Sequence, residues 1–344
     1  MRQLLFEGAR QARWAETPCP EISSDLSAIV RPVAVSTCDM DAVALSGLIR
    51  FKAGTPLGHE GVGIVTDVGD KVSRVAVGDR VIIPWQISCG TCERCRRGQD
   101  THCTTVAPGS CYGWGPHVAR WGGFLAEQVE VPFADHMLVP VPTSLPSTTA
   151  SGLGDNLVDA WRAIGPPLQA SRGGRVLVIG GVFGDGGSIG LYAVAYAVGL
   201  GAEEVVFVSH DAGLCRLAAA YGATAQRVAD TYEDVGAFGV TVETSGVPGA
   251  LAFALRSTGP SGVCTCTAGA VHRGNDVPIP VYEMYMNTVT FTTGWVHTRS
   301  CIDEPLRLIE GQLFDPLSIA RMATFDEAPE AFAEPFVKLV LADE

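Results

Sequence analysis

A regular alternation of fully apolar strands with helical segments, beginning at about Gly174, is the strongest constraint on the fold. The predicted strands are residues 176–179, 205–208, 240–244 and 263–267, and the predicted helices are 187–199, about 214–221 and about 249–255. Strands that are apolar on both faces must be buried on both sides. When such strands alternate with helices, they form a parallel sheet covered by helices. The second half is therefore predicted to be a doubly wound α/β domain.

The first half of the chain has a different pattern. From about Leu26 to about Ala150, short β-type runs such as 61–68, 80–84 and 125–132 are broken by Gly and Pro, which predicts an antiparallel, barrel-like β domain. After residues 289–295 the strand–helix alternation stops. The tail, with a predicted helix at 301–310, is too short for its own core, so we expect it to pack on the first domain. The predicted domains are 1–153 with 296–344, and 154–295.

Composition excludes several classes of partner. The chain has 344 residues and a formal charge of −13, which repels phosphate backbones and anionic lipid, so we expect neither nucleic acid nor a membrane as partner. Residues 176–202 are apolar enough to suggest a membrane span, but their crowded glycines favour a strand, a tight loop and a helix. No secretory signal is visible in residues 1–16, and the 11 cysteines are an odd number. We therefore expect a reducing, cytoplasmic location.

A cysteine cluster predicts a metal site. Cys89, Cys92, Cys95 and Cys103 lie within fifteen residues, and Gly90 allows the segment to wrap around an ion. Four thiolates are the ligands that Zn²⁺ prefers in closed, structural sites. Unrelated free cysteines, a zinc ribbon that binds nucleic acid and an iron–sulfur cluster are the alternatives.

A second set of candidate ligands is spread along the first half. Cys38, the pair His59 and Glu60, and Asp155 are each unremarkable alone, because single Cys and His residues are usually buried or hydrogen-bonded structural residues. Together, a thiolate, an imidazole and a carboxylate form a three-ligand set that leaves one zinc position open, as in catalytic zinc sites.

The order of these motifs resembles the medium-chain, zinc-dependent alcohol dehydrogenase family. The resemblance rests on residues 58–63, 77–81, 89–95 and 122–127, on Asp155, and on the glycine-rich turn after residue 179. It implies a GroES-like catalytic domain, a Rossmann domain, and hydride transfer between an alcohol or carbonyl substrate and NAD(P). It further implies two Zn²⁺ per chain, a small-molecule substrate and a homodimer or homotetramer.

The resemblance also assigns roles to individual residues. Cys38, His59 and Asp155 would bind the catalytic zinc, with Glu60 beside it or as an alternating ligand, and Trp85 would line the substrate pocket. The position that often carries a proton-relaying Ser or Thr holds Met40, whose thioether has no proton to give. Asp39 and Asp41 flank it in what we expect to be an extended segment, and we favour a structural role for them.

The glycine-rich turn predicts a dinucleotide site. Strand 176–179, the turn and the following helix have the order in which a pyrophosphate binds a helix N-terminus. The predicted contacts are Gly180, Gly181, Gly187, Ser188, Ile189 and Gly190, with an insertion over 182–186. A turn without a ligand is the alternative.

Residues after the second strand of this domain bear on the choice of cofactor. Ser209 occupies the place where NAD-specific proteins carry an acid on the ribose, and His210 could add a charge, so the sequence slightly favours NADP. Asp211 could instead contact the ribose and favour NAD. Two further functions stay open: a zinc- and cofactor-binding protein whose alcohol chemistry has lapsed, and a reductase of an activated alkene or iminium.

Overall fold

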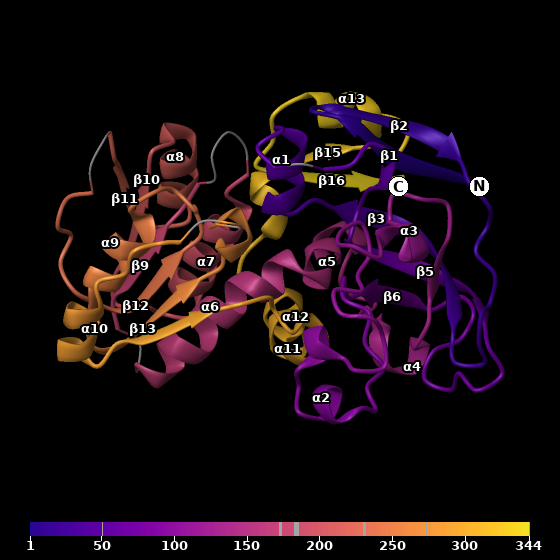
Figure 1. Cartoon of the computed structure of the whole chain (residues 1–344), viewed down its shortest axis with the longest axis horizontal. Coiled ribbons are helices and arrows are strands. Elements are labelled where there is room, and N and C mark those ends of the chain that lie inside the picture. Colours follow the sequence, from indigo (N-terminus) through magenta and orange to yellow (C-terminus); the bar gives the residue numbers. More distant parts are fainter. Residues whose placement is uncertain are drawn as a thin grey trace. The chain divides into compact units, whose positions relative to one another are not determined.

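The computed structural model describes residues 1–49, 51–171, 174–181, 186–229, 232–272, 274 and 276–343. The chain divides into two units, Met1–Val158 with Val296–Glu344, and Asp159–Trp295. Each unit is built on its own main sheet (Figure 1). The α/β fold class predicted from the sequence is confirmed.

The second unit contains a parallel sheet in the order β11-β10-β9-β12-β13-β14. Its strands are β9 (Val176–Ile179), β10 (Val205–Ser209), β11 (Thr224–Arg227), β12 (Phe238–Glu243), β13 (Thr258–Cys266) and β14 (Thr290–Thr293). All residues of β9 and β10 are buried, as expected for central strands of a covered parallel sheet. The edge strand β11 was not predicted, because Thr-Ala-Gln-Arg is polar and largely exposed.

Helices alternate along the chain with the strands of this sheet (Figure 1). They are α6 (Asn156–Ala170), α7 (Ser188–Gly199), α8 (Ala212–Ala220), α9 (Ala250–Arg256), the 3₁₀ turn η3 (Gly269–His272) and α10 (Val281–Asn287). Helix α7 is buried from Ser188 to Ala197, because its sequence is apolar around the whole circumference. In the described part of the chain, no helix combines the length and hydrophobicity of a membrane span.

The first unit is mainly antiparallel. One sheet has the order β15-β16-β3-β5-β6-β8, with β7 paired to β3, and a smaller sheet has the order β2-β1-β4. The strands are β1 (Arg2–Gly8), β2 (Gln11–Glu16), β3 (Ala28–Ser36), β4 (Thr55–Pro56), β5 (Glu60–Val68), β6 (Arg80–Ile83), β7 (Val129–Val131), β8 (Val139–Pro140), β15 (Ala320–Ala323) and β16 (Lys338–Ala342). The tail of the chain enters this sheet, because Val340 of β16 lies opposite Ser36 of β3.

Short helices connect the strands of the first unit. They are α1 (Asp39–Leu45), α2 (Glu93–Arg96), η1 (Asp100–His102), α3 (Val118–Trp121), α4 (Ala134–Met137), α5 (Ser147–Ala150), η2 (Ser151–Gly154), α11 (Thr298–Cys301), α12 (Asp303–Glu310), η4 (Pro316–Ile319) and α13 (Ala328–Ala333). A core of buried apolar side chains that includes Leu4, Val30, Phe124 and Leu339 packs against these elements. This core supports the strand ends that carry the candidate ligands.

Candidate functional site

Cys38 lies between the end of β3 and the start of α1. Its Sγ accepts a hydrogen bond from the Met40 amide at 3.2 Å, and its own amide donates to Asp41 Oδ2 at 2.9 Å, which together form a capping box. The prediction of an extended segment here was wrong, because this local capping starts a helix. Asp41 therefore points back to the helix start and toward His59, in agreement with the structural role favoured for it.

His59 lies between two carboxylates. Its Nδ1 is 3.5 Å from Asp41 Oδ1, and its Nε2 is 3.4 Å from Asp155 Oδ2. Burial disfavours the imidazolium, but the charge of Asp41 and the contact with Asp155 outweigh it and hold the pKa of His59 well above its usual value. A carboxylate on one ring nitrogen orients a histidine so that the other nitrogen can bind a metal. Asp41 is thus placed to orient His59.

Cys38, His59 and Asp155 converge. Each offers one ligand atom, and these atoms lie within 4.8 Å of one another. Burial raises the pKa of the Cys38 thiol to about 12, so the thiolate needs a cation beside it. A thiolate, an imidazole and a carboxylate at this spacing fit Zn²⁺ and leave one position of its tetrahedron open.

Glu60 is fully buried but belongs to a different set of contacts. Its Oε1 lies 2.5 Å from Lys338 Nζ and accepts from Ser36 Oγ at 3.2 Å, while its Oε2 accepts from the Asn156 amide at 2.8 Å. Burial raises the pKa of Glu60 to about 7, although the Lys338 ammonium acts in the opposite direction. Lys338 was not among the residues predicted for the site. The signal for it was a lone lysine inside the apolar run 336–341.

Met40 and Trp85 lie between the ligands along the chain, Met40 before His59 and Trp85 after it. Met40 is half-buried in the first turn of α1, and its backbone amide contacts Cys38 Sγ. Trp85 lies two residues after the end of β6, is 8% exposed, and its ring centre is 6.0 Å from that of His59. The Met40 backbone and the Trp85 side chain therefore lie near the ligands. Trp114 stacks on Phe51, with ring centres 4.9 Å apart.

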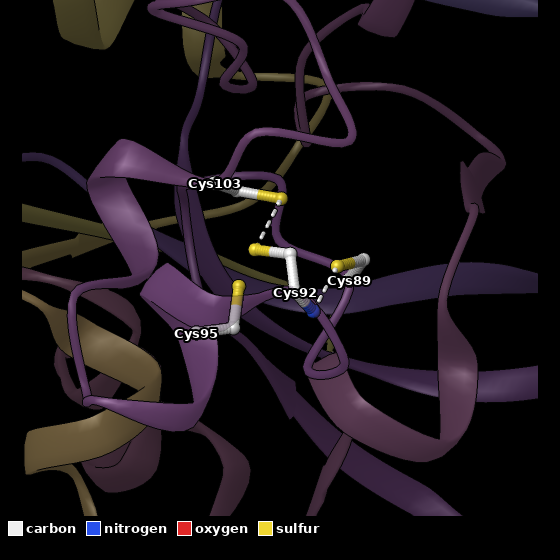
Figure 2. A group of neighbouring side chains, drawn as sticks. All are labelled: Cys89, Cys92, Cys95 and Cys103. Carbon is white, nitrogen blue, oxygen red and sulfur yellow. Dashed lines mark hydrogen bonds between the residues drawn. The ribbon is translucent and has the colours of Figure 1, made fainter.

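The four remaining candidate ligands gather around α2. Figure 2 shows Cys89, Cys92, Cys95 and Cys103 with their sulfur atoms pointing toward one another, and their ligand atoms also lie within 4.8 Å. Cys89 Sγ accepts hydrogen bonds from Thr105 Oγ1 at 3.0 Å and from the Cys92 amide at 3.3 Å. Backbone hydrogen bonds lower the pKa of Cys92 to about 5. These contacts favour the thiolate form of Cys89 and Cys92, whereas burial raises the pKa of Cys95. Four thiolates fit a closed zinc site.

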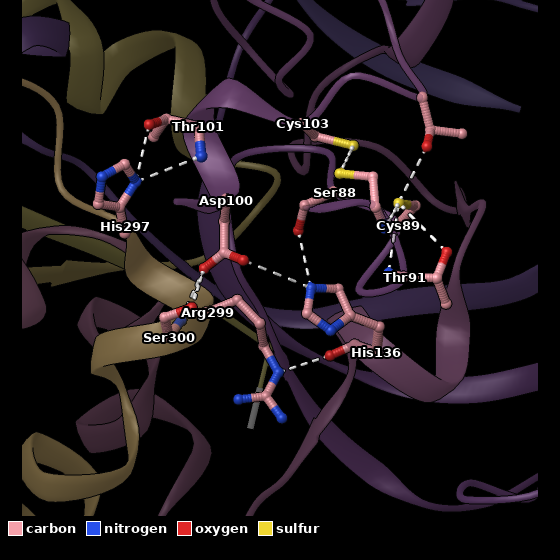
Figure 3. A network of polar contacts seen from close by, with 12 residues as sticks. Ser88, Cys89, Thr91, Asp100, Thr101, Cys103, His136, His297, Arg299 and Ser300 are labelled. Carbon is pink, nitrogen blue, oxygen red and sulfur yellow. Dashed lines mark hydrogen bonds and ion pairs between the residues drawn. The ribbon is translucent and has the colours of Figure 1, made fainter. Parts of the chain in front are cut away.

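An acid beside this cluster was missed by the sequence analysis. Asp100 is 1% exposed, and its Oδ2 accepts from the Ser300 amide at 2.8 Å and from Ser300 Oγ at 2.6 Å (Figure 3). Its Oδ1 lies 3.7 Å from His136 Nε2. Burial opposes the carboxylate, but the contacts with His136 and Ser300 lower the pKa of Asp100. The four-cysteine segment is thereby joined to α11.

The predicted dinucleotide contacts lie at the carboxyl ends of the strands in the second unit. Gly180 and Gly181 follow β9, and Gly187, with φ of +105°, directly precedes α7. A Cβ on Gly190 would lie 2.8 Å from Thr244 Oγ1 and 3.3 Å from Gly180 Cα, so only glycine allows α7 to approach the strand ends this closely. Ser188 and Ile189 lie in the first turn of α7, and both are buried. The predicted insertion over 182–186 falls outside the described residues except for Gly186.

Three residues at the end of β10 complete the predicted site. Ser209 is the last residue of the strand, and a Cβ on Gly181 would lie 2.9 Å from its Oγ. His210 Nδ1 is 3.1 Å from the Val228 carbonyl oxygen. Asp211 caps α8, because its Oδ1 accepts from the amides of Gly213 and Leu214 at 2.5 and 2.9 Å. The glycine turn and the end of β10 therefore face each other.

Comparison with known proteins identifies relatives. A family model described as the alcohol dehydrogenase GroES-like domain matches residues 24–143. An alcohol dehydrogenase of Geobacillus stearothermophilus is 30% identical over 304 residues, which are 85% of this chain and 83% of that protein. A zinc-type alcohol dehydrogenase-like protein of Schizosaccharomyces pombe is 31% identical over 221 residues, which are 60% of this chain and 51% of that protein.

The whole fold also has a counterpart among solved structures. The alcohol dehydrogenase of Thermus sp. ATN1 matches with a TM-score of 0.87 at 28% identity, over 99% of both chains. The resemblance first seen in the motifs thus extends over the whole length. The chain therefore belongs to the medium-chain, zinc-dependent alcohol dehydrogenase family of oxidoreductases.

Proposed function

We propose that this protein transfers a hydride between an alcohol and the corresponding carbonyl compound, using NAD(P) and one catalytic Zn²⁺. The observation that carries the proposal is the convergence of Cys38, His59 and Asp155 in a chain of this family. A zinc ion bound there would polarise the substrate oxygen, and the nicotinamide would accept or donate the hydride.

The residues around the ligands have defined tasks in this proposal. Cys38 and Asp155 supply the negative charges that bind the cation, and Asp41 orients His59 through Nδ1. Lys338 binds the Glu60 carboxylate and so restrains it near the ligands. Met40 has no ionisable side chain, so the proton released on alcohol oxidation must leave through another group or through water.

The second part of the proposal concerns the four cysteines. Cys89, Cys92, Cys95 and Cys103 would bind a second Zn²⁺ per chain. Four thiolates leave no open position, so this ion would stabilise the fold and take no part in the reaction.

The cofactor would bind at the glycine turn. Gly180, Gly181 and Gly187 would form the turn around the pyrophosphate, and Ser188, Ile189 and Gly190 form the first turn of α7 beneath it. We propose NADP as the cofactor, because Ser209 places no carboxylate at the ribose and Asp211 is engaged in capping α8.

Replacing one ligand tests the proposal. Asp155→Ala removes a charged ligand from an open site, so kcat/KM for the best alcohol of a substrate panel should fall about a hundredfold or more. Metal analysis should show the loss of one zinc per chain while circular dichroism is unchanged. Asp70→Ala, in an exposed turn, is the matched control and should behave like the wild type. Full turnover by Asp155→Ala would exclude this ligand set.

A further inference from the structure

We infer that Arg227 binds the 2′-phosphate of NADP and is the residue that makes this protein prefer NADP over NAD. The inference rests on the proposed function and deepens it. The sequence offered no Arg or Lys next to Ser209, because Arg227 lies eighteen positions further along the chain. The sheet brings the two together.

The register of the sheet places Arg227 beside Ser209. Strands β10 and β11 are parallel neighbours, and Ser209 and Arg227 are Cα partners at their carboxyl ends. Residues in register on neighbouring strands project to the same face of a sheet. In α/β sheets ligands bind outside the carboxyl ends of the strands, and the end of this strand is where the ribose is recognised.

A hydrogen bond then holds the guanidinium in place. Arg227 Nε donates to the carbonyl oxygen of His210 at 3.2 Å. This bond uses one of the five N–H donors of an arginine. The side chain of Arg227 is exposed, so the guanidinium can reach a ligand. A planar guanidinium anchored in this way is suited to a phosphate, to which it can donate two parallel hydrogen bonds.

The local charges favour an anion. Asp211 is committed to α8 through Gly213 and Leu214, whereas Arg216 of α8 adds a second positive charge. The charges of Asp211, Arg227 and Arg216 all act on Cys215, where burial is the main cause of the raised pKa, so all three lie around the start of α8. Among these three groups, two cations stand against one engaged carboxylate, and the adjacent cavity is lined by one further acid, Asp234, and one further cation, Arg256.

The adjacent cavity has room for the nucleoside that would carry this phosphate. His210, whose carbonyl oxygen accepts from Arg227, also lines a cavity of about 730 Å³ with Tyr232, Val247 and Phe253. The ring centres of His210 and Tyr232 are 5.6 Å apart, and those of Tyr232 and Phe253 are 4.6 Å apart. A purine ring in this aromatic cavity would place its ribose near His210, within reach of Arg227.

Equilibrium binding to the zinc-loaded protein tests the inference without relying on turnover. The probes are NADP⁺ and NAD⁺, together with 2′,5′-ADP and 5′-AMP, which differ by the same phosphate. The wild type should bind each phosphorylated probe about tenfold or more tightly than its partner. Arg227→Gln should abolish this difference and leave the affinity for NAD⁺ and 5′-AMP within about twofold of the wild type.

Arg31→Gln is the matched control, since it removes the same charge from an exposed position of β3 in the other unit and should retain the preference for NADP⁺. Equal losses in the two variants, or unchanged discrimination in Arg227→Gln, would overturn the inference. A wild type that prefers NAD⁺ would also overturn it, while alcohol-dependent reduction of NAD⁺ would leave the proposed function intact. If the wild type bound neither dinucleotide, both proposals would be wrong.

Discussion

Glu60 is a buried carboxylate, and the cation that compensates its charge, Lys338, lies 278 positions further along the chain. It is 0% exposed, and the Lys338 ammonium, itself 1% exposed, lies 2.5 Å away. Taking two charges out of water costs several kcal/mol for each ion, and only close contact and further hydrogen bonds offset this cost. Ser36 and the Asn156 amide supply such bonds. The pair therefore ties β5 to β16 beside the candidate zinc ligands.

We predict how removal of the Lys338 side chain changes the stability of the protein. Lys338→Met leaves Glu60 buried and uncompensated, so the free energy of unfolding should fall by about 3–5 kcal/mol. The double variant Glu60→Gln with Lys338→Met should lose less than either single variant, because no unpaired charge stays behind. Urea titration of the zinc-loaded proteins measures both. Additive losses in the double variant would show that the two side chains do not act as a pair.

The four-cysteine segment is an element with little regular structure, held by side chains outside the set of four cysteines. It contains the four-residue helix α2 and the 3₁₀ turn η1. Arg299 Nε donates to the His136 carbonyl oxygen at 2.5 Å, and Asp100 accepts two hydrogen bonds from Ser300 (Figure 3). Helix α11 is thus fastened to both η1 and α4.

We predict that Asp100 is the main fastening of this element. Asp100→Ala removes an acceptor of two hydrogen bonds, and the free energy of unfolding should fall by about 3 kcal/mol, since bonds to a charged group contribute about 1.5–3 kcal/mol each. Amide hydrogen exchange at Ser300 should become faster. Asp100→Asn keeps one carbonyl acceptor and should show a smaller effect. Unchanged exchange at Ser300 in Asp100→Ala would contradict the assignment.

In the whole molecule, the candidate zinc sites and the candidate dinucleotide site lie in different units. The cysteine cluster and the candidate ligands Cys38, His59 and Asp155 lie in Met1–Val158 with Val296–Glu344, whereas the glycine turn and the end of β10 lie in Asp159–Trp295. Each unit has its own hydrophobic core. Loss of zinc should therefore destabilise the first unit first, and loss of the cofactor should destabilise the second unit first.

This separation leads to a prediction for Cys92→Ala. The variant should lose one zinc per chain, and the first unit should melt about 10 °C or more below the wild type, because a structural zinc contributes directly to folding. The affinity of the second unit for NADP⁺ should stay within about twofold of the wild type. Cys19→Ala replaces an exposed cysteine outside the cluster and is the control. An unchanged zinc content in Cys92→Ala would refute the structural zinc.

Features that depend on neighbours in the chain could be predicted from the sequence. The central strands β9 and β10 were predicted from their apolar runs 176–179 and 205–208. A helix over 187–199 was predicted after the glycine-rich turn, and α7 begins one residue later, at Ser188. The cysteines from 89 to 103 could be grouped because a segment of fifteen residues can close around one point. The local sequence predicted the wrong structure around Asp41. An extended segment was expected, but a capping box starts a helix there.

By itself, the sequence determined the α/β class, the spaced cysteines and the place of the glycine turn, since these follow from periodicity and short loops. Only the tertiary structure decided which distant residues become partners. Lys338 reaches Glu60 because β16 and β5 flank β3, and Arg227 lies beside Ser209 because β11 pairs with β10 in one register. Strand order and register are set by the packing of the whole unit, and a lone charged residue carries no local signal of them.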